Sequence, residues 1–220
     1  MTKLKKIELN KELMLLWLSK LEFLNEEEQY FIKSISNKYC NDNVQQLYKF
    51  NEAIYNNEEN YIDLNTGFSF QKINADYIIT LENKTLKLEK EEFTKIIQGM
   101  IDILEDILPL GSVVRLKKKY LNKLVDNNEI DAADVVIVNR FSISDNINTY
   151  YHYTAIVYPL GVIGEARGIN FTSNLIEDVI YKGFSDERED TYIYLMKKEL
   201  LIKNEMTSFC FANKNANGDY

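Results

Sequence analysis

Only two prolines occur in the chain, and the first of them, Pro109, stands where the apolar pattern changes. Residues 90–107, KEEFTKIIQGMIDILEDI, place apolar side chains three and four positions apart, which predicts an amphipathic helix. Proline disfavours helical backbone at the residue before it, and Gly111 can adopt a positive φ. After LPLG the apolar residues come in short runs rich in Val and Ile, which indicate strands. The pattern therefore predicts a helical region followed by a sheet, within an α+β fold.

Helical spacing also predicts three helices closer to the N-terminus. Apolar residues of segment 8–24 fall on one stripe of a helix. Asn25 can cap a second helix in a capping-box pattern with the Glu three residues later. A third helix fits residues 42–56, with Asn41 or Asp42 as its cap. We therefore expect a small helical unit in this part of the chain.

Strand patterns follow these helices. The segments TGFSFQKI, ADYIITLEN and KTLKLEK, between residues 66 and 90, are rich in β-branched and aromatic side chains and are separated by Asn and Gly. LENKT is typical of a hairpin turn between the last two segments. Residues 1–105 are thus predicted to form an N-terminal region of helices and a small antiparallel hairpin or sheet.

A second group of strands is predicted after Pro109. The segments SVVRLKK, ADVVIVNRF, YYHYTAIVYPLG and EDVIYKGF fit a further sheet, with the continuous apolar run Val135–Val138 at its middle. Residues 185–203 predict a closing helix capped by Ser185. Residues 106–205 should therefore form an α+β domain whose antiparallel sheet, or small barrel, is closed by a helix. Residues 206–220 begin apolar and end polar, and we expect a tail that is disordered toward its end.

Catalytic chemistry has little support in the sequence. His152 is the only histidine, which excludes a metal site built on two or more imidazoles. The chain has no Gly-x-x-x-x-Gly-Lys phosphate loop, and its acidic clusters, such as NEEEQ and SDERED, lie at predicted helix starts, where they complement the helix dipole. We expect a non-enzymatic protein without catalytic, cofactor-binding or metal-binding residues, without a cofactor and without a small-molecule ligand. An uncharacterised enzyme stays open as a minor alternative.

Charge narrows the choice of partners. The net charge of −8 argues against a sequence-independent grip on nucleic acid or on an anionic membrane. No stretch approaches the roughly 20 apolar residues that span a bilayer. The first residues are basic and then apolar, but the apolar run is short and no cleavage site follows, so we expect a cytoplasmic protein.

Tyrosines concentrate in the second half of the chain, and tyrosine is enriched at protein interfaces. Most aromatic residues in strands belong to the core, although the alternation of a strand turns some of them outward. His152 is most simply a structural strand residue. The candidates for partner contact are Tyr150, His152 and Tyr192.

The C-terminal half resembles a bacterial family known as domain of unknown function 4176. The resemblance rests on the order and spacing of LPLGSVV at 108–114, VVIVNRF at 135–141, YHYTAIVYPLG at 151–161, INFTSNLIEDVIYKGF at 169–184 and SDERE at 185–189. The chain departs from the family pattern at Asn139, His152 and Leu160, so roles of those side chains do not transfer. The motif residues that match, to which the resemblance assigns a structural role, are Pro109, Gly111, Ser112, Tyr151, Tyr153, Tyr158, Pro159, Gly161 and Gly183.

The resemblance implies a genetic setting rather than a reaction. Proteins of this kind look like accessory members of type VII secretion loci in Gram-positive bacteria, beside secreted toxins with an N-terminal Leu-x-Gly domain. The resemblance thus implies a cytoplasmic chaperone or adaptor that binds a cognate toxin before export. An immunity protein that neutralises the toxin domain is the alternative.

Overall fold

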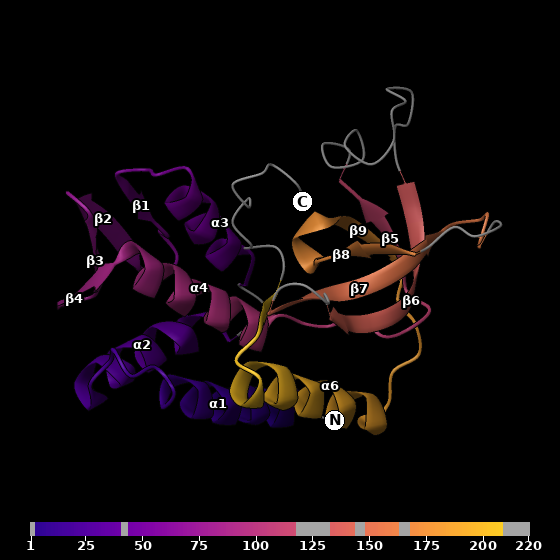
Figure 1. Cartoon of the computed structure of the whole chain (residues 1–220), viewed down its shortest axis with the longest axis horizontal. Helices are drawn as coiled ribbons and strands as arrows, with labels where there is room; N and C mark the ends of the chain where they lie inside the picture. Colours follow the sequence, from indigo (N-terminus) through magenta and orange to yellow (C-terminus); the bar gives the residue numbers. More distant parts are fainter. Residues whose placement is uncertain (1–2, 41–43, 118–132, 144–147, 163–167, 209–220) are drawn as a thin grey trace. The chain divides into compact units, whose positions relative to one another are not determined.

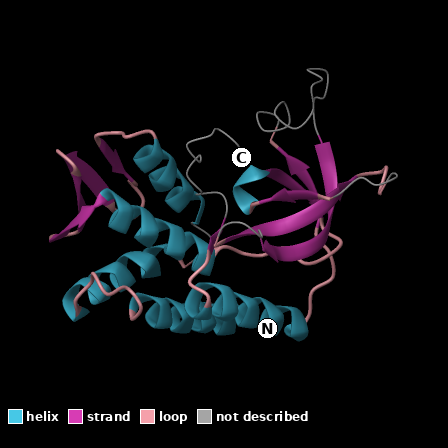
Figure 2. Cartoon of the chain, viewed as in Figure 1, coloured by secondary structure: helices cyan, strands magenta, loops and turns pink. Residues whose placement is uncertain are grey.

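The computed structural model describes residues 3–40, 44–117, 133–143, 148–162 and 168–208 (Figure 1). The chain divides into two compact units. The first comprises Met1–Glu105 with Lys197–Asn204, and the second comprises Asp106–Met196 with Glu205–Tyr220. Figure 2 distinguishes the helices and strands of which each unit is built. The expected α+β class is confirmed: N-terminal helices with a four-stranded sheet are followed by a six-stranded sheet.

Four helices of the first unit are α1 (Lys3–Leu18), α2 (Glu26–Tyr39), α3 (Val44–Tyr55) and α4 (Lys90–Leu104). The predicted capping box of α2 is confirmed, because the side chain of Asn25 accepts the Glu28 N–H at 3.0 Å and the Glu28 carboxylate accepts the Asn25 N–H at 2.8 Å. The caps predicted for α3, at positions 41 and 42, lie outside the described residues.

The first helix ends earlier than its apolar pattern predicted. It stops at Leu18, and the chain continues in turns whose N–H groups of Leu21 and Leu24 bond to carbonyls three residues back, each at 3.0 Å. Leu21 and Leu24 are still buried. Tight turns keep apolar side chains on the core side at nearly helical spacing, so the sequence pattern alone does not separate the two.

The four-stranded sheet has the order β1 (Asn60–Ile62), β2 (Ser69–Ile73), β3 (Asp76–Leu81), β4 (Lys84–Glu89), and every pair is antiparallel. The hairpin predicted at LENKT joins β3 to β4, whereas β1 was not predicted. One face of the sheet packs on α3 and α4 through an aromatic cluster, whose members are Phe50, Phe68, Phe70, Tyr77 and Phe93.

Close contacts fix the position of α4. A Cβ on Gly99 would lie 2.0 Å from the ring of Trp17, so this glycine, a weak point for helix propensity, makes room for α1. The helix ends at Leu104, three residues before the predicted end. Lys197 lies within the same unit, and its buried ammonium donates to the carbonyls of Ile103 at 2.8 Å and Glu105 at 2.6 Å. A cation on the last carbonyls complements the helix dipole.

The six-stranded sheet of the second unit has the order β10 (Thr207–Ser208), β7 (Thr149–Val157), β6 (Ala133–Ile143), β5 (Val113–Leu116), β9 (Ile176–Tyr181). Neighbouring strands of this sheet are antiparallel, except that β10 is parallel to β7. A further strand, β8 (Ile169–Phe171), pairs antiparallel with β7. The described strands do not close into the small barrel that we considered. The expected mid-sheet place of Val135–Val138 is confirmed, since β6 lies between β5 and β7.

The helix predicted over 185–203 consists of α6 (Glu187–Lys197) and the π-helix η2 (Lys198–Lys203). Asp186, rather than Ser185, caps it: the Asp186 carboxylate accepts the N–H groups of Arg188 at 3.0 Å and Glu189 at 3.3 Å. The short 3₁₀ turn η1 (Ser173–Leu175) follows β8. The tail predicted from residue 206 begins with β10, and residues 209–220 lie outside the described residues.

Candidate interaction surface

The sheet of the second unit carries an apolar row across one face. Cross-strand partners line up as Tyr181 on β9, Val113 on β5, Val136 on β6 and Ile156 on β7. The tyrosine is 61% exposed, and the three aliphatic residues are half-buried. The opposite face is the core side, where the strand neighbours of these residues, Val114, Val135 and Ala155 among them, are fully buried. We call the partly exposed side the open face of the second sheet.

A charged row lies beside the apolar one on the open face. Arg115 and Asp134, which are cross-strand partners, form a bidentate ion pair with N–O distances of 2.9 and 3.1 Å. The hydrogen bond from Arg115 holds the pKa of the Asp134 carboxyl below its usual range, and the same bond raises the pKa of the guanidinium. Both groups therefore keep their charges at neutral pH. The open face thus combines an apolar row with one paired charge.

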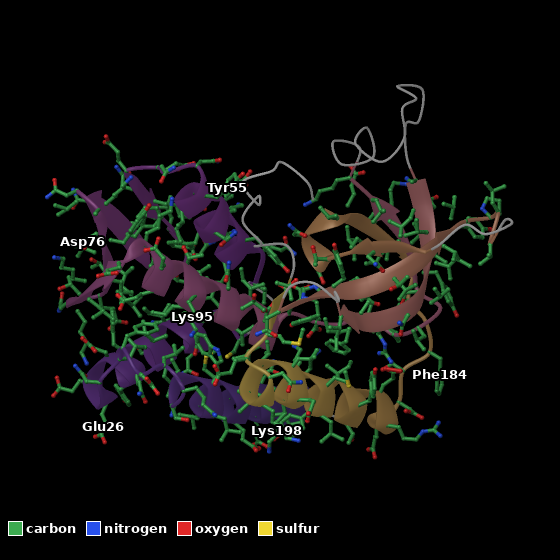
Figure 3. All side chains as sticks on the ribbon, viewed as in Figure 1. Glu26, Tyr55, Asp76, Lys95, Phe184 and Lys198 are labelled. Atoms are coloured by element: carbon green, nitrogen blue, oxygen red, sulfur yellow. The ribbon has the colours of Figure 1, made fainter. Side chains whose placement is uncertain are left out.

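More apolar side chains are exposed where the strands end. Val138, the bulged residue between β6 and β7, is 44% exposed. The two Pro-Leu-Gly turns lie at opposite ends of the sheet: Gly111 bonds to the carbonyl of Ile137, whereas Tyr158 bonds to the carbonyl of Asp134. Exposed apolar residues in or near these turns are Leu110, Tyr158, Leu160, Val162 and Phe184, the last of which is labelled in Figure 3.

The first Pro-Leu-Gly turn is held by Ser112 and Gly183. The buried hydroxyl of Ser112 donates to the carbonyl of Pro109 at 2.7 Å and accepts the N–H of Gly183 at 3.0 Å. A Cβ on Gly183 would stand 2.1 Å from the carbonyl oxygen of Leu110, so the backbones approach too closely for any side chain. Gly111 has φ +77°, which favours glycine. These motif residues, far apart in sequence, thus form one structural junction.

A second junction surrounds Tyr153, which is fully buried. Its hydroxyl accepts the N–H of Leu108 at 3.0 Å, and its ring packs on Phe171 with centroids 5.2 Å apart. His152 is also fully buried, and its Nδ1 accepts the N–H of Ser173 at 3.1 Å. Since a backbone N–H can only donate, the neutral imidazole carries its proton on Nε2. The described contacts give this histidine a role in holding the segment after β8.

A third junction joins β6 to α6. The guanidinium of Arg140 is buried, forms a bidentate ion pair with Glu189, and lies 4.9 Å from the ring centroid of Tyr192. Phe141 contacts Tyr192 edge-on with centroids 6.1 Å apart. Phe141 adopts φ +54°, which is strained for an aromatic residue. The buried ion pair and its ring contacts fix α6 on the sheet.

The candidates for partner contact occupy different environments. Tyr150 and His152 are 1% and 0% exposed, so neither reaches the surface, whereas Tyr192 is 39% exposed above Arg140. Among the motif tyrosines, Tyr151 is half-buried, with a pKa raised by burial, and Tyr158 is exposed.

The remaining motif residues, Pro159 and Gly161, belong to the second Pro-Leu-Gly turn, in which the N–H of Gly161 bonds to the carbonyl of Val157 at 2.8 Å.

Sequence reasoning missed the exposed aliphatic residues of β9 and Val138. Val179 and Ile180 are adjacent apolar residues with no polar residue between them. Such a run, read from the sequence alone, indicates a buried strand. Their place on an edge strand exposes them at 42% and 47%. The acidic residues just before them are the signal that could have marked an edge.

No group of three or more His, Cys, Asp or Glu side chains in the described ranges could hold a metal ion. Among the helices that the structure describes, none has the length and apolar character that crossing a membrane requires.

Comparison with known proteins gives a family match within the second unit. Residues 107–192 match the model of a family described as domain of unknown function (DUF4176). The match begins at the first Pro-Leu-Gly turn and ends inside α6, so it confirms the resemblance read from the motifs and includes all three junctions. Neither the curated proteins nor the solved structures contain a match to the chain.

Proposed function

We propose that this chain is a non-enzymatic binding protein that holds a protein partner on the open face of its second sheet. The observation that carries the proposal is the row of Tyr181, Val113, Val136 and Ile156, with Val138 exposed beside it. Complete burial of one such side chain by a partner is worth about 1.5–3 kcal/mol. Apolar side chains gathered on a sheet face therefore favour association with another apolar surface.

The proposed partner is a secreted toxin with an N-terminal Leu-x-Gly domain, and the proposed role is that of a chaperone or adaptor in type VII secretion. The motif resemblance supports this partner class. The net charge of −8 favours a partner whose contact surface is basic around an apolar centre. The paired charges on the second sheet, Arg115 with Asp134 and Arg140 with Glu189, serve the fold in this proposal.

Co-expression with the toxin encoded beside this chain tests the proposal. We expect the two proteins to co-purify, and we expect Val138→Glu to weaken the complex by about tenfold or more because it introduces a charge into an apolar contact. Ile73→Glu is the matched control, since Ile73 is also aliphatic, also 44% exposed, and lies on β2 of the other sheet. Absence of co-purification, or equal loss in both variants, would contradict the proposal.

Deletion in the producing cell separates the chaperone from the immunity protein. Loss of a chaperone lowers the amount of exported toxin and leaves the producer healthy. Loss of an immunity protein slows or kills the producer while toxin export continues. Val138→Glu should reproduce the deletion phenotype, and Ile73→Glu should behave as wild type.

A further inference from the structure

The strand β9 stands at one end of the second sheet with an edge to which no described strand is paired. It bonds to β5 along one side and is last in the strand order. Three consecutive apolar residues, Val179, Ile180 and Tyr181, are 42%, 47% and 61% exposed. An exposed strand edge with apolar side chains on both faces is a template for pairing with another strand.

The edge strand β4 of the first unit has the opposite character. Its exposed positions are Lys84, Thr85, Lys87 and Glu89, and charged side chains on an edge discourage pairing between chains. On β9 the charges stand only at the ends of the apolar triplet: Glu177 and Asp178 precede it, and Lys182 follows it, all of them exposed. The charge at one end is therefore the opposite of the charge at the other.

We infer that β9 pairs antiparallel with β9 of a second copy of this chain. A twofold axis between Val179 and Ile180 sets Glu177 of each copy opposite Lys182 of the other, so the favourable charge contact occurs twice. Val179 and Ile180 of the two copies then face each other at the centre of the pair, and Tyr181 of each copy lies opposite Asp178 of the other. In a parallel, in-register arrangement each charged residue would instead lie beside the same residue of the other copy, so like charges would be neighbours. The sequence of β9 is thus self-complementary in the antiparallel direction only.

The bulges of β9 limit how strong this pairing can be. Relative to β5, the strand has one extra residue at Glu177 and another at Ile180. Bulges increase the local twist and shorten the ladder that an edge can form. The interface is therefore a small one, and we expect a reversible dimer with a dissociation constant on the order of 10 µM.

Charge exchange on the full-length chain tests the inference. Sedimentation equilibrium should find wild type dimerising between about 1 and 200 µM. Glu177→Lys and Lys182→Glu should each weaken the dimer about tenfold, because like charges then face each other at both ends. An equimolar mixture of these two variants should form a heterodimer, and the double variant E177K/K182E should dimerise like wild type. Recovery in the mixture also demonstrates that both single variants are folded.

Lys84→Glu is the control variant, because it makes the same charge change on the edge strand β4 and should leave the dimer unaffected. Wild type that stays monomeric throughout the range would overturn the inference, as would a dimer that survives Lys182→Glu or single variants that fail to recover on mixing. Toxin binding is measured separately at Val138, so the failure of either proposal is distinguishable from the failure of the other.

Discussion

The two sheets of this chain bury one face in the same way but differ in what their open faces carry. Across the first sheet the open-face row is Gln71, Ile78 and Lys87, with Ser69, Thr80 and Thr85 in the next row. Across the second sheet the corresponding row is Tyr181, Val113, Val136 and Ile156. Polar side chains on an open face form hydrogen bonds with water, whereas removing apolar side chains from water is favourable in free energy. The open face of the first sheet is therefore mostly polar, whereas the apolar row of the second sheet would gain from being covered.

One edge strand of each sheet repeats this contrast. The edge strand β4 exposes charges, and β9 exposes Val179, Ile180 and Tyr181. The family match covers only residues 107–192, which contain the apolar face and the apolar edge. The apolar face and edge, for which we propose partner contact, therefore lie within the matched residues.

The largest effect should follow from Gly183→Ala, which tests whether the junction of motif residues supports the second sheet. An added Cβ would lie 2.1 Å from the carbonyl oxygen of Leu110, so the backbone must move. We expect a loss of more than about 3 kcal/mol in the free energy of unfolding, measured by urea denaturation. Gly111→Ala is the comparison, because its Cβ would meet nothing within 4 Å and only the positive φ is unfavourable. Equal losses in both variants would show that the close contact at Gly183 is unimportant.

The next largest effect concerns the first unit. Lys197→Met keeps the length of the side chain but removes the donor that serves the carbonyls of Ile103 and Glu105. We expect the free energy of unfolding to fall by about 2–3 kcal/mol, because buried carbonyl groups lose their partner. Hydrogen exchange should increase in the last turn of α4. Lys198→Met is the neighbouring control, and a stability loss as large as that of Lys197→Met would contradict the capping role.

Exchange of single open-face residues tests the contrast between the sheets directly. Val136→Thr and Ile78→Thr each replace a half-buried aliphatic residue with a hydroxyl-bearing one at the centre of its row. We expect similar small losses of stability, about 1 kcal/mol each. Only Val136→Thr should weaken toxin binding, by about fivefold in a titration with the purified partner. Weakening by Ile78→Thr would remove the distinction between the two faces.

The smallest effect is the response of the open-face ion pairs to pH. The pKa of Asp134 is lowered by the hydrogen bond from Arg115, so the pair contributes stability above the unfolded pKa of Asp, about 3.9, and loses it as pH falls through the folded value. The pKa of Lys87 is raised by its bond to Asp76, so that contribution is present below about 10.4 and is lost as pH rises through the folded value.

The pKa shifts of Asp134 and Lys87 therefore act at opposite ends of the pH range. Asp134→Asn should flatten the acid limb of the unfolding free energy, and Lys87→Met should flatten the alkaline limb. Both effects should be small, because the groups are partly exposed and screened by solvent. An acid limb that is unchanged in Asp134→Asn would contradict the role given to its pair with Arg115.

Local sequence patterns predicted the structure correctly where a residue type strongly prefers one local conformation or cap. The capping box at Asn25 and Glu28 and the hairpin at LENKT were read correctly, because each depends on neighbours within a few residues. The limits of α1 and α4 were not, because Leu21 and Leu24 stay buried in turns and the end of α4 is capped by Lys197 from the far end of the sequence. Short strands such as β1, β8 and β10 have too few residues to show a period.

The candidate surface was predicted less well than the fold. The sequence drew attention to the tyrosines of the second half, but Tyr150 is buried against Phe141, whereas Tyr158, Tyr181 and Tyr192 are exposed. The aliphatic residues Val138 and Val179 look like core in the sequence, because an apolar strand reads the same at the centre of a sheet and at its edge. The exposure of a side chain on a strand depends on whether another strand or helix packs against it, and this is a property of the whole fold.

The amino-acid sequence alone established the order of the helices and of the longer strands, the change of pattern at Pro109 and the match of residues 107–192 to a family model, because turn chemistry and apolar periodicity are local. Tertiary structure decided that Ser112 joins Pro109 to Gly183, that Arg140 joins Glu189, and that His152 is a buried acceptor. It also decided which valines are core and which form the open face, since strand order and register set the neighbours that exclude water.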